Sequence, residues 1–458
     1  MRVILLALAT SLACESRSHV QCLHEADCDL SSGGRCIAAA SGNRWCAYPD
    51  PACPSGYRYS DLDVGDGVSG ECVAVAMDGG VDAPVDVAID ADGSVTTGQF
   101  ADLVIGQNDF LSDTANSGGQ SASSLFGAMS AASDGTRLWI ADARNARLLQ
   151  FNALPVVNRP VANVIVGQAE ATSSAPGTSQ TTLRVGDLSA VAAGGKLFVV
   201  DGASNRVLIY GSLPAAHGAP ASVVLGQASF TTSAGGKSAS GLNGPADVWS
   251  DGTRLVVVDN ANSRVLIWTS LPTTNGQAAN IVLGRPGFGL GLGDPPADPP
   301  TSASMKFPVG VWSNGTRLYV ADAGNHRVMV WNQFPTTSGQ PCDFVIGQTA
   351  FSGNTPNAGG AIANAIGLHT PYRAVEANGS LFISDSMNHR VVVHTPIPST
   401  SGEAADVVLG QDNLDSNDLP SIPTGNRMSS PRHIVATGGH LYVPDYQWNR
   451  VLRFELEP

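Results

Sequence analysis

The chain has 458 residues, of which 43% are hydrophobic and 14% are charged, so it can bury one large core or several smaller ones. Glycine is abundant and aromatic residues make up only 6%, a composition that favours strands and turns over long helices. The formal net charge of -14 argues against nucleic acid and anionic lipid as partners, because phosphate binding needs clustered Lys and Arg.

Residues 1–14, MRVILLALATSLAC, predict an export signal. One Arg precedes a short apolar run, which is typical of a signal peptide and too short for a membrane-spanning helix. The final SLAC resembles a bacterial lipobox, although Ser11 stands where Leu is usual. We therefore expect lipidation at Cys14, and the alternative is a simple secretory signal with Cys14 near its cleavage site. The lipid would anchor the protein to the bacterial outer membrane, on its periplasmic or surface side.

Residues 15–73 form a predicted cysteine-rich module. An even, dense set of cysteines in an exported segment indicates disulfides, which would stabilise a segment too short for a strong core. A zinc site is the weaker alternative because the module has no CxxC motif, and the sequence does not choose among the possible disulfide pairings. The six cysteines of the module are Cys22, Cys28, Cys36, Cys46, Cys53 and Cys72.

Residues 74–99 are small and acidic and include no aromatic residue, so they predict a flexible linker. Such a linker would join a lipid anchor to a large domain. Cys342, far from the other cysteines, stands where other repeats have Ala or Ser and is expected to be a small buried residue.

From about residue 100 the chain is internally repetitive, and this is its strongest signal. One motif recurs as ADLVIGQ, NVIVGQ, SVVLGQ, NIVLGR, DFVIGQ and DVVLGQ. A second motif begins with an Asp that recurs at spacings of 59, 58, 63, 63 and 60 residues. The repeated unit is therefore about sixty residues long.

Each unit is predicted to form four short strands, because β-branched runs alternate with Gly and Pro turns. Six such units are typical of a β-propeller, whereas a solenoid would have shorter repeats and capping units. The repeat opens with a lone fourth strand and closes after a third one, so the N-terminal strand is expected to complete the last blade and leave no open edge. Residues 100–458 are thus predicted to be an all-β, six-bladed propeller with four-stranded blades.

The segment PVGVWSNGTRLYVADAGNHRVMVW resembles an NHL repeat, with its Pro-led strand, Gly turn, YVAD and Asn-His-Arg. The resemblance covers about 360 residues and is specific in blades three to five. The GQ motif and the long loop after it resemble a bacterial branch of exported NHL-like proteins. Blades one, two and six depart, with DARNAR, DGASNR and DYQWNR, which leaves the geometry of their turns open.

The second motif holds an Asp and an Arg five residues apart in all six units, whereas His326 recurs only as His389. A catalytic site is needed once and a turn in every blade, so these pairs are predicted to be structural. The Asp would accept backbone N–H groups of the turn, and the Arg would pair with it or reach a nearby carbonyl. The pairs are Asp142 and Arg147, Asp201 and Arg206, Asp259 and Arg264, Asp322 and Arg327, Asp385 and Arg390, and Asp445 and Arg450.

In a propeller, the turn between the second and third strands lies on the same face as the link to the next blade, here called the top face. The bottom loops of this chain hardly change between units, while the top links are long, variable and rich in Ser, Thr, Asn and Gly. Long variable loops on a rigid scaffold are typical binding sites. Their composition suits a protein or carbohydrate, and the alternative is mere surface covering.

Candidate ligand-binding residues lie at the starts of inner strands. His369 and Arg373 of blade five and Arg432 and His433 of blade six form a basic cluster beside the expected channel. Some propellers related to the NHL family are lyases that hold zinc with channel histidines. Here the two histidines stand on opposite sides of their Pro and no third blade matches them, so ordinary ligand contacts are favoured.

Asp247 and Glu376 lie on inner strands of blades three and five and could supply oxygen ligands to calcium, as in propeller lactonases. We nevertheless expect an exported, monomeric binding or scaffolding protein of the cell envelope, with no cofactor and a protein or carbohydrate ligand. A metal-dependent lyase or lactonase that uses Zn or Ca in the channel is the alternative. A purely structural envelope component is the third.

Overall fold

The structure is a computed structural model that describes residues 35–38, 44–49, 57–59, 95–291, 293–294 and 296–456. The chain divides into two units, residues 1–85 and 86–458. The signal peptide with Cys14, the linker before residue 95, and Cys22, Cys28, Cys53 and Cys72 lie outside the described residues, so these expectations stay predictions. Within the described residues, none of the helices combines the length and hydrophobicity needed to cross a bilayer.

The first unit contains a small antiparallel sheet in the order β1-β2-β3. Its strands are β1 (Arg35–Ala38), β2 (Arg44–Pro49) and β3 (Tyr57–Tyr59). Cys36 lies directly opposite Cys46 in the register of β1 and β2, and Cys46 is buried. The predicted disulfide framework as a whole stays a prediction.

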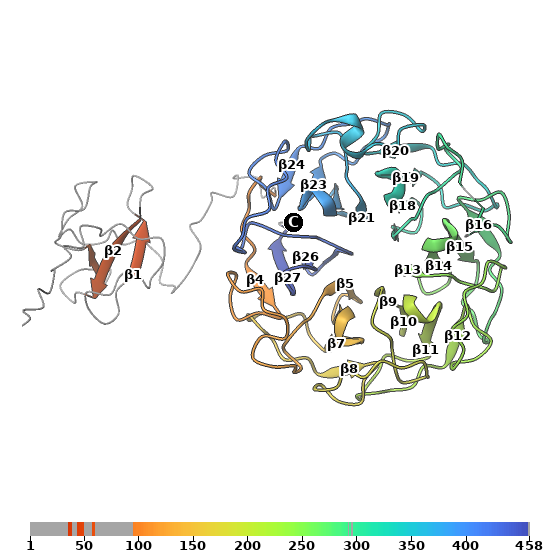
Figure 1. Cartoon of the computed structure of the whole chain (residues 1–458), viewed down its shortest axis with the longest axis horizontal. Helices are drawn as coiled ribbons and strands as arrows, with labels where there is room; N and C mark the ends of the chain where they lie inside the picture. The colour runs from red at the N-terminus through yellow and green to blue at the C-terminus, as the bar shows by residue number, and fades with distance from the viewer. Residues whose placement is uncertain are drawn as a thin grey trace, which may run out of the picture. The chain divides into compact units, whose positions relative to one another are not determined.

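The second unit is a ring of six four-stranded antiparallel sheets, which confirms the predicted propeller (Figure 1). In every sheet the first strand lies nearest the axis and the last strand lies at the rim (Figure 1). Blades one to three are β5 (Ala128–Ser133), β6 (Leu138–Asp142), β7 (Arg147–Phe151) and β8 (Val164–Val166); β9 (Leu188–Ala193), β10 (Lys196–Asp201), β11 (Arg206–Tyr210) and β12 (Val223–Leu225); and β13 (Pro245–Ser250), β14 (Leu255–Asp259), β15 (Arg264–Trp268) and β16 (Ile281–Leu283).

Blades four to six follow the same order. They are β17 (Gly310–Ser313), β18 (Leu318–Asp322), β19 (Arg327–Trp331) and β20 (Phe344–Ile346); β21 (Pro371–Ala377), β22 (Ser380–Asp385), β23 (Arg390–His394) and β24 (Val407–Leu409); and β25 (Val435–Thr437), β26 (His440–Asp445), β27 (Arg450–Glu455) and β4 (Leu103–Ile105). Short 3-10 helices are η2 (Ala143–Asn145), η3 (Gly202–Ser204), η4 (Asn260–Asn262), η5 (Ala323–Asn325), η6 (Pro356–Gly359) and η7 (Ser386–Asn388).

The ring closes between the two ends of the propeller. Strand β4 pairs with β27, and Val451 lies opposite Ile105, as the phase of the repeat predicts. The residues before β4 also contact blade five, because the N–H of Gly98 donates to the carbonyl of Val408 (3.1 Å). No sheet edge is therefore left open between the first and last blades.

The middle strands carry nearly continuous apolar runs because both of their faces are buried between neighbouring blades. All five residues of β15, RVLIW, are buried, and the same holds for β11 and β19. One core cluster joins blades three and four through Val256, Val258 and Val320. Each fully buried Val, Leu or Ile contributes about 1.5–3 kcal/mol, so the interfaces between blades dominate the stability.

The bottom loops vary little because each one caps the outer strand of the preceding blade. The N–H of Val104 in β4 donates to Asn158 Oδ1 in the loop of blade one (3.0 Å). The N–H of Val224 in β12 donates to Asn275 Oδ1 in the loop of blade three (3.0 Å). A repeated contact of this kind restricts the loop in every blade and leaves the top face as the variable one.

Candidate functional site

Six buried ion pairs between Asp and Arg lie beneath the top face, one in each blade. The Arg Nε atom donates to the Asp Oδ2 atom at 2.7 to 3.0 Å, and neither side chain is exposed. They join the last residue of the second strand to the first residue of the third, as in Asp142 and Arg147. We call these six pairs the latches.

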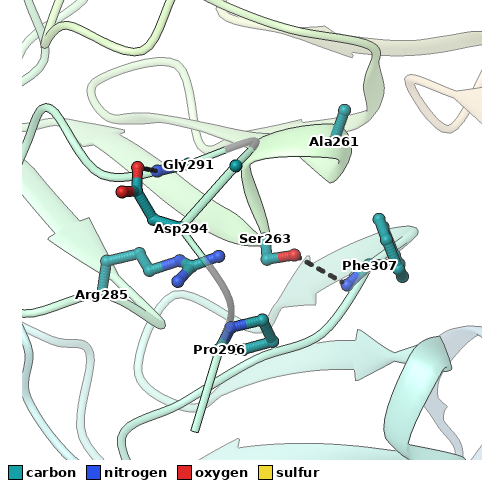
Figure 2. Close-up of a pocket in the computed structure, with 8 residues that line it drawn as sticks. Ala261, Ser263, Arg285, Gly291, Asp294, Pro296 and Phe307 are labelled. Atoms are coloured by element: carbon teal, nitrogen blue, oxygen red, sulfur yellow. Dashed lines mark hydrogen bonds between the residues drawn. The ribbon is translucent and has the colours of Figure 1, made fainter.

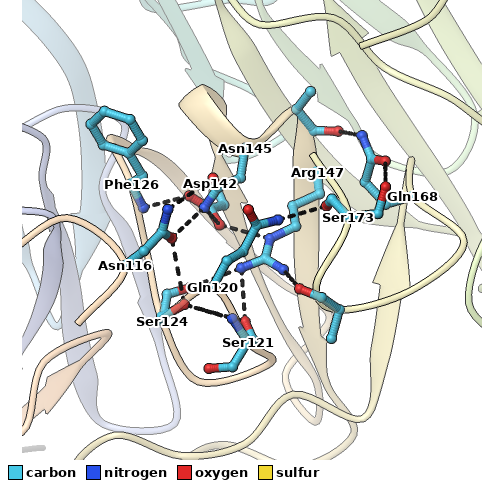
Figure 3. Close-up of polar contacts among 12 residues, drawn as sticks. Asn116, Gln120, Ser121, Ser124, Phe126, Asp142, Asn145, Arg147, Gln168 and Ser173 are labelled. Carbon is cyan, nitrogen blue, oxygen red and sulfur yellow. Dashed lines mark hydrogen bonds and ion pairs between the residues drawn. The ribbon is translucent and has the colours of Figure 1, made fainter. Parts of the chain in front are cut away.

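Each latch also holds the long top link of its blade, as Figure 3 shows for blade one. Asp142 Oδ1 accepts the N–H of Phe126 (2.7 Å). The guanidinium of Arg147 donates to the carbonyls of Ser121 (2.8 Å) and Ser124 (3.0 Å). The Asp thus accepts an N–H group from the link before the first strand, and not one from its own turn as expected. The top links are therefore fixed to the scaffold and present a preorganised surface.

The turns of blades one, two and six match the others at the residue before the Arg, despite their different sequences. A residue in the left-handed region precedes the Arg in all six blades, with φ between 52° and 56°: Ala146, Asn205, Ser263, His326, His389 and Asn449. Its side chain often caps the next blade. Asn205 Oδ1 accepts the N–H of Gly244 (2.7 Å), and His326 Nδ1 accepts the N–H of Thr370 (3.2 Å).

The channel is crossed by a second buried polar cluster, which includes Asp247, Arg373 and His433 from the predicted set. The guanidinium of Arg373 in β21 makes a two-point ion pair with Asp247 in β13, with Nε to Oδ2 at 3.0 Å. Ser189 in β9 donates to Asp247 Oδ1 (2.5 Å) and lies 3.2 Å from the hydroxyl of Ser130 in β5. All five side chains are buried, and we call them the axial cluster.

The axial cluster satisfies its charges internally. The N–H of Val311 in blade four donates to Asp247 Oδ2 (2.9 Å), so both carboxylate oxygens are occupied. His433 Nε2 lies 2.9 Å from the carbonyl of Val309 and must carry the proton that this bond needs. Burial lowers the pKa of His433 to about 4, so its imidazole is neutral at pH 7.

The residues predicted as zinc or calcium ligands do not all lie in one group. Among the described residues, no group of three or more His, Cys, Asp or Glu side chains converges as metal ligands would. Asp247 is neutralised by Arg373, and Glu376 lies at the other end of β21, where it accepts hydrogen bonds from Tyr319 (2.5 Å) and Asn314 (3.0 Å). Burial, and then Glu376, raise the pKa of Tyr319.

His369 also lies apart from the axial cluster. Its backbone N–H donates to the latch carboxylate of Asp385 (2.6 Å). Its ring packs edge-on against His326, with centroids 5.2 Å apart. Burial lowers the pKa of His326 to about 4. This histidine pair lies where blades four and five meet on the top face.

Arg432 belongs to a row of alternating aromatic and guanidinium groups on the top face. Its guanidinium carbon lies 4.0 Å from the ring centroid of Tyr372 and 4.7 Å from that of Tyr446. Arg144 lies over Tyr446 (5.4 Å) and Phe126 (5.1 Å), and its Nε donates to the Tyr446 hydroxyl (3.1 Å). These five residues from blades five, six and one are the cation–π row.

The row has features of a binding surface. Arg144 is exposed, while Phe126, Tyr372, Arg432 and Tyr446 are partly buried. Each cation–π contact contributes about 0.5–2 kcal/mol, which fixes these flexible side chains before any ligand arrives. The carboxyl of Asp187, before β9, lies within electrostatic range of Arg432. Its pKa is raised because many protein atoms surround the carboxyl and reduce its hydration, which outweighs the opposite effect of Arg432. The residue nevertheless keeps an exposed surface.

The sequence contains a pattern that indicates this row, although the repeated motifs do not include it. At the two turn positions that follow the latch Asp, the other blades carry small or unbranched residues such as Gly202, Ala203 and Gly324. Blade one has Arg144 and blade six has Tyr446 at these positions. The bulky departures from a repeated turn thus gather in two neighbouring blades.

Comparison with known proteins gives only distant structural likenesses. No family model and no curated protein matches the sequence. Among solved structures, a streptogramin B lyase is 12% identical with a TM-score of 0.37, over 77% of this chain and 87% of that one. A virginiamycin B lyase from Staphylococcus aureus is 14% identical with a TM-score of 0.37, over 72% and 95%. An auxiliary nutrient binding protein from Bacteroides thetaiotaomicron is 11% identical with a TM-score of 0.39, over 73% and 70%.

Proposed function

We propose that this chain is an exported, NHL-like propeller of the cell envelope that binds a protein ligand on its top face, at the cation–π row. The observation that carries the proposal is the contrast between two groups of charges. The ion pair of the axial cluster is buried and satisfied internally, whereas Arg144 is exposed and the rings around it are only partly buried on a fixed scaffold. Interface hot spots are enriched in Tyr and Arg at their centre.

A protein ligand fits better than a carbohydrate because the ring faces are already covered. A sugar would need an open aromatic face, but Arg432 lies over both Tyr372 and Tyr446, and His433 packs against Tyr372 (5.4 Å). Exposed apolar side chains on other top-face segments, such as Val185, Phe307 and Met387, would extend a protein contact.

The remaining parts of the proposal concern location. An export signal with a lipid on Cys14, a module braced by disulfides and a flexible linker would hold the propeller at the outer membrane. The described chain enters the propeller at the bottom, where Gly98 contacts β24. A tether at the bottom would leave the top face free to meet a partner.

The test compares capture of envelope proteins by three forms of the full-length chain. The wild type and a control, Arg317→Ala at a bottom hairpin, should capture the same partner and should bind the purified partner with the same dissociation constant. The double variant Arg144→Ala, Tyr446→Ala should bind that partner at least tenfold more weakly. Equal affinity of all three forms would contradict the proposal. Stoichiometric zinc or calcium in the purified chain, lost in His433→Ala, would favour the enzyme alternative.

A further inference from the structure

A pocket of about 240 Å³ opens on the top face of blade three, whereas the cation–π row belongs to blades five, six and one. Arg285 enters it just after β16, and Ser263 lines it from the turn of the same blade (Figure 2). The rest of the lining that would contact a ligand comes from the top link, with Asp294, Pro296 and, near its end, Phe307. The pocket combines a few polar groups with apolar walls, as small-molecule sites do.

Arg285 is the one departure from a glutamine that recurs in the other five blades. Each glutamine side chain donates to two backbone carbonyls; for example, Gln168 Nε2 donates to Ala146 (3.1 Å) and Ala175 (3.0 Å). Arg285 keeps one such contact, from Nε to the carbonyl of Asn262 (3.2 Å). Its side chain is longer, so the end of the guanidinium extends into the pocket (Figure 2).

Arg285 is only 5% exposed, yet no carboxylate of the described residues lies within ion-pair distance of it. The nearest acid that acts on it electrostatically is Asp294. Asp294 Oδ2 is engaged by Lys237 Nζ (2.8 Å) and by the N–H of Gly291 (3.1 Å). The buried arginines of the six latches and of the axial cluster all have a carboxylate partner. A buried guanidinium without one favours an anion beside it.

We propose that this pocket binds a small carboxylate that carries a hydroxyl or ammonium group on the adjacent carbon. The guanidinium of Arg285 presents paired donors that suit a carboxylate. Ser263 Oγ accepts the N–H of Phe307 (3.2 Å), so its hydroxyl proton is free to donate to the same ligand. Asp294 Oδ1 accepts no hydrogen bond within the described chain and can take the ligand's hydroxyl or ammonium proton.

The size of the pocket limits the ligand. A water molecule occupies about 30 Å³ in the liquid, so the pocket has room for roughly eight non-hydrogen atoms. Phe307, Pro296 and Ala261 would contact the ligand's apolar part. The chemical class is therefore that of short 2-hydroxy acids and 2-amino acids.

Isothermal titration of the full-length chain with lactate, alanine, propionate and inorganic phosphate tests the proposal. Lactate or alanine should bind with a millimolar or lower dissociation constant, at least fivefold tighter than propionate. Arg285→Gln restores the residue of the other blades, so it should fold with an unchanged or higher melting temperature and lose at least tenfold in affinity. Arg184→Gln, an exposed arginine of another top link, is the matched control and should bind as the wild type does.

Asp294→Asn separates the two halves of the ligand. The variant should bind lactate and alanine no more tightly than propionate, because the substitution removes the charged acceptor. Phosphate that binds as tightly as lactate would replace the carboxylate assignment with a general anion site and overturn the proposal. Two other results would also overturn the proposal. One is binding that survives Arg285→Gln, and the other is no measurable heat with any of the four compounds at about 10 mM.

Discussion

Arg373 of blade five and Asp247 of blade three form a buried ion pair across the propeller channel, between residues 126 positions apart in the sequence. The pair can form only after blades three, four and five have packed in order, because the two inner strands belong to blades separated by a third. It therefore joins the packing of three successive blades to the burial of two charges. A buried pair of this kind contributes little net stability when intact, but loss of one partner is costly.

Asp247→Asn should destabilise the propeller by about 3–5 kcal/mol, because it leaves the Arg373 guanidinium buried without a counter-charge. The double variant Asp247→Asn, Arg373→Gln should lose much less than the sum of the two single variants. Urea unfolding of all four proteins gives the coupling. Strictly additive losses would show that the pair is not an energetic unit.

Arg327→Lys should cost about 2–3 kcal/mol and loosen the top link of blade four. A lysine ammonium cannot hold Asp322 and the carbonyls of Thr301 and Ser304 at once, as the guanidinium does. Hydrogen exchange at the amide of Lys306, which donates to Asp322 Oδ1, should become faster. Arg317→Lys, which changes a partly exposed arginine on a bottom hairpin, is the matched control with an expected cost below about 1 kcal/mol.

Stability should fall as the pH drops from 7 towards 4. Burial lowers the pKa of His433 to about 4 in the folded protein, from an ordinary value of 6.5. The unfolded chain thus binds the extra proton first, and the stabilising contribution present above about pH 6.5 is lost as the pH falls, up to roughly 3 kcal/mol. His433→Gln should flatten this part of the curve measured by thermal unfolding.

His326 shifts in the same direction and serves as the internal comparison for that experiment. His326→Asn should remove a second, separate part of the acid sensitivity, because an Asn at this position can still cap the next blade as Asn205 does. A pH profile that neither substitution changes would mean that other groups govern the acid response.

Removal of β4 should open the ring. A chain that begins at residue 95 keeps the pairing of β4 with β27, whereas one that begins at residue 107 exposes the edge of β27. The shorter chain should melt at a lower temperature and associate through its free edge, as seen by size-exclusion chromatography. Equal melting temperature and a monomeric state for both chains would contradict closure by the N-terminal strand.

The repeat made the fold predictable from the sequence, because each of the six copies of the pattern predicts the same order of strands. The phase of the repeat even predicted which end supplies the closing strand. The turns were harder. The Asn of blades two and six lies one position late, yet Asn205 and Asn449 take the same left-handed conformation as Ala146 and His326, since the latch and the next blade hold the turn.

The candidate site was predictable only in part. Asp247, Arg373 and His433 meet at the axis, and Arg432 lies beside them. Glu376 instead contacts Tyr319, and His369 packs against His326. Contacts across the channel depend on the position of one blade relative to another, which a linear pattern does not contain. Arg144 and Tyr446 could have been found by asking where a repeated turn carries an unusually large residue.

Photo-crosslinking in the native host tests the central claim most directly. A photoreactive residue placed at the exposed Gln447, beside Tyr446 on the top face, is compared with one placed at the exposed Val157 of the bottom loop in blade one. The account predicts one discrete protein adduct at position 447, abolished by Arg432→Ala and Tyr372→Ala, and none at position 157. Adducts at position 157 alone, or an adduct at position 447 that survives both substitutions, would contradict a ligand surface at the cation–π row.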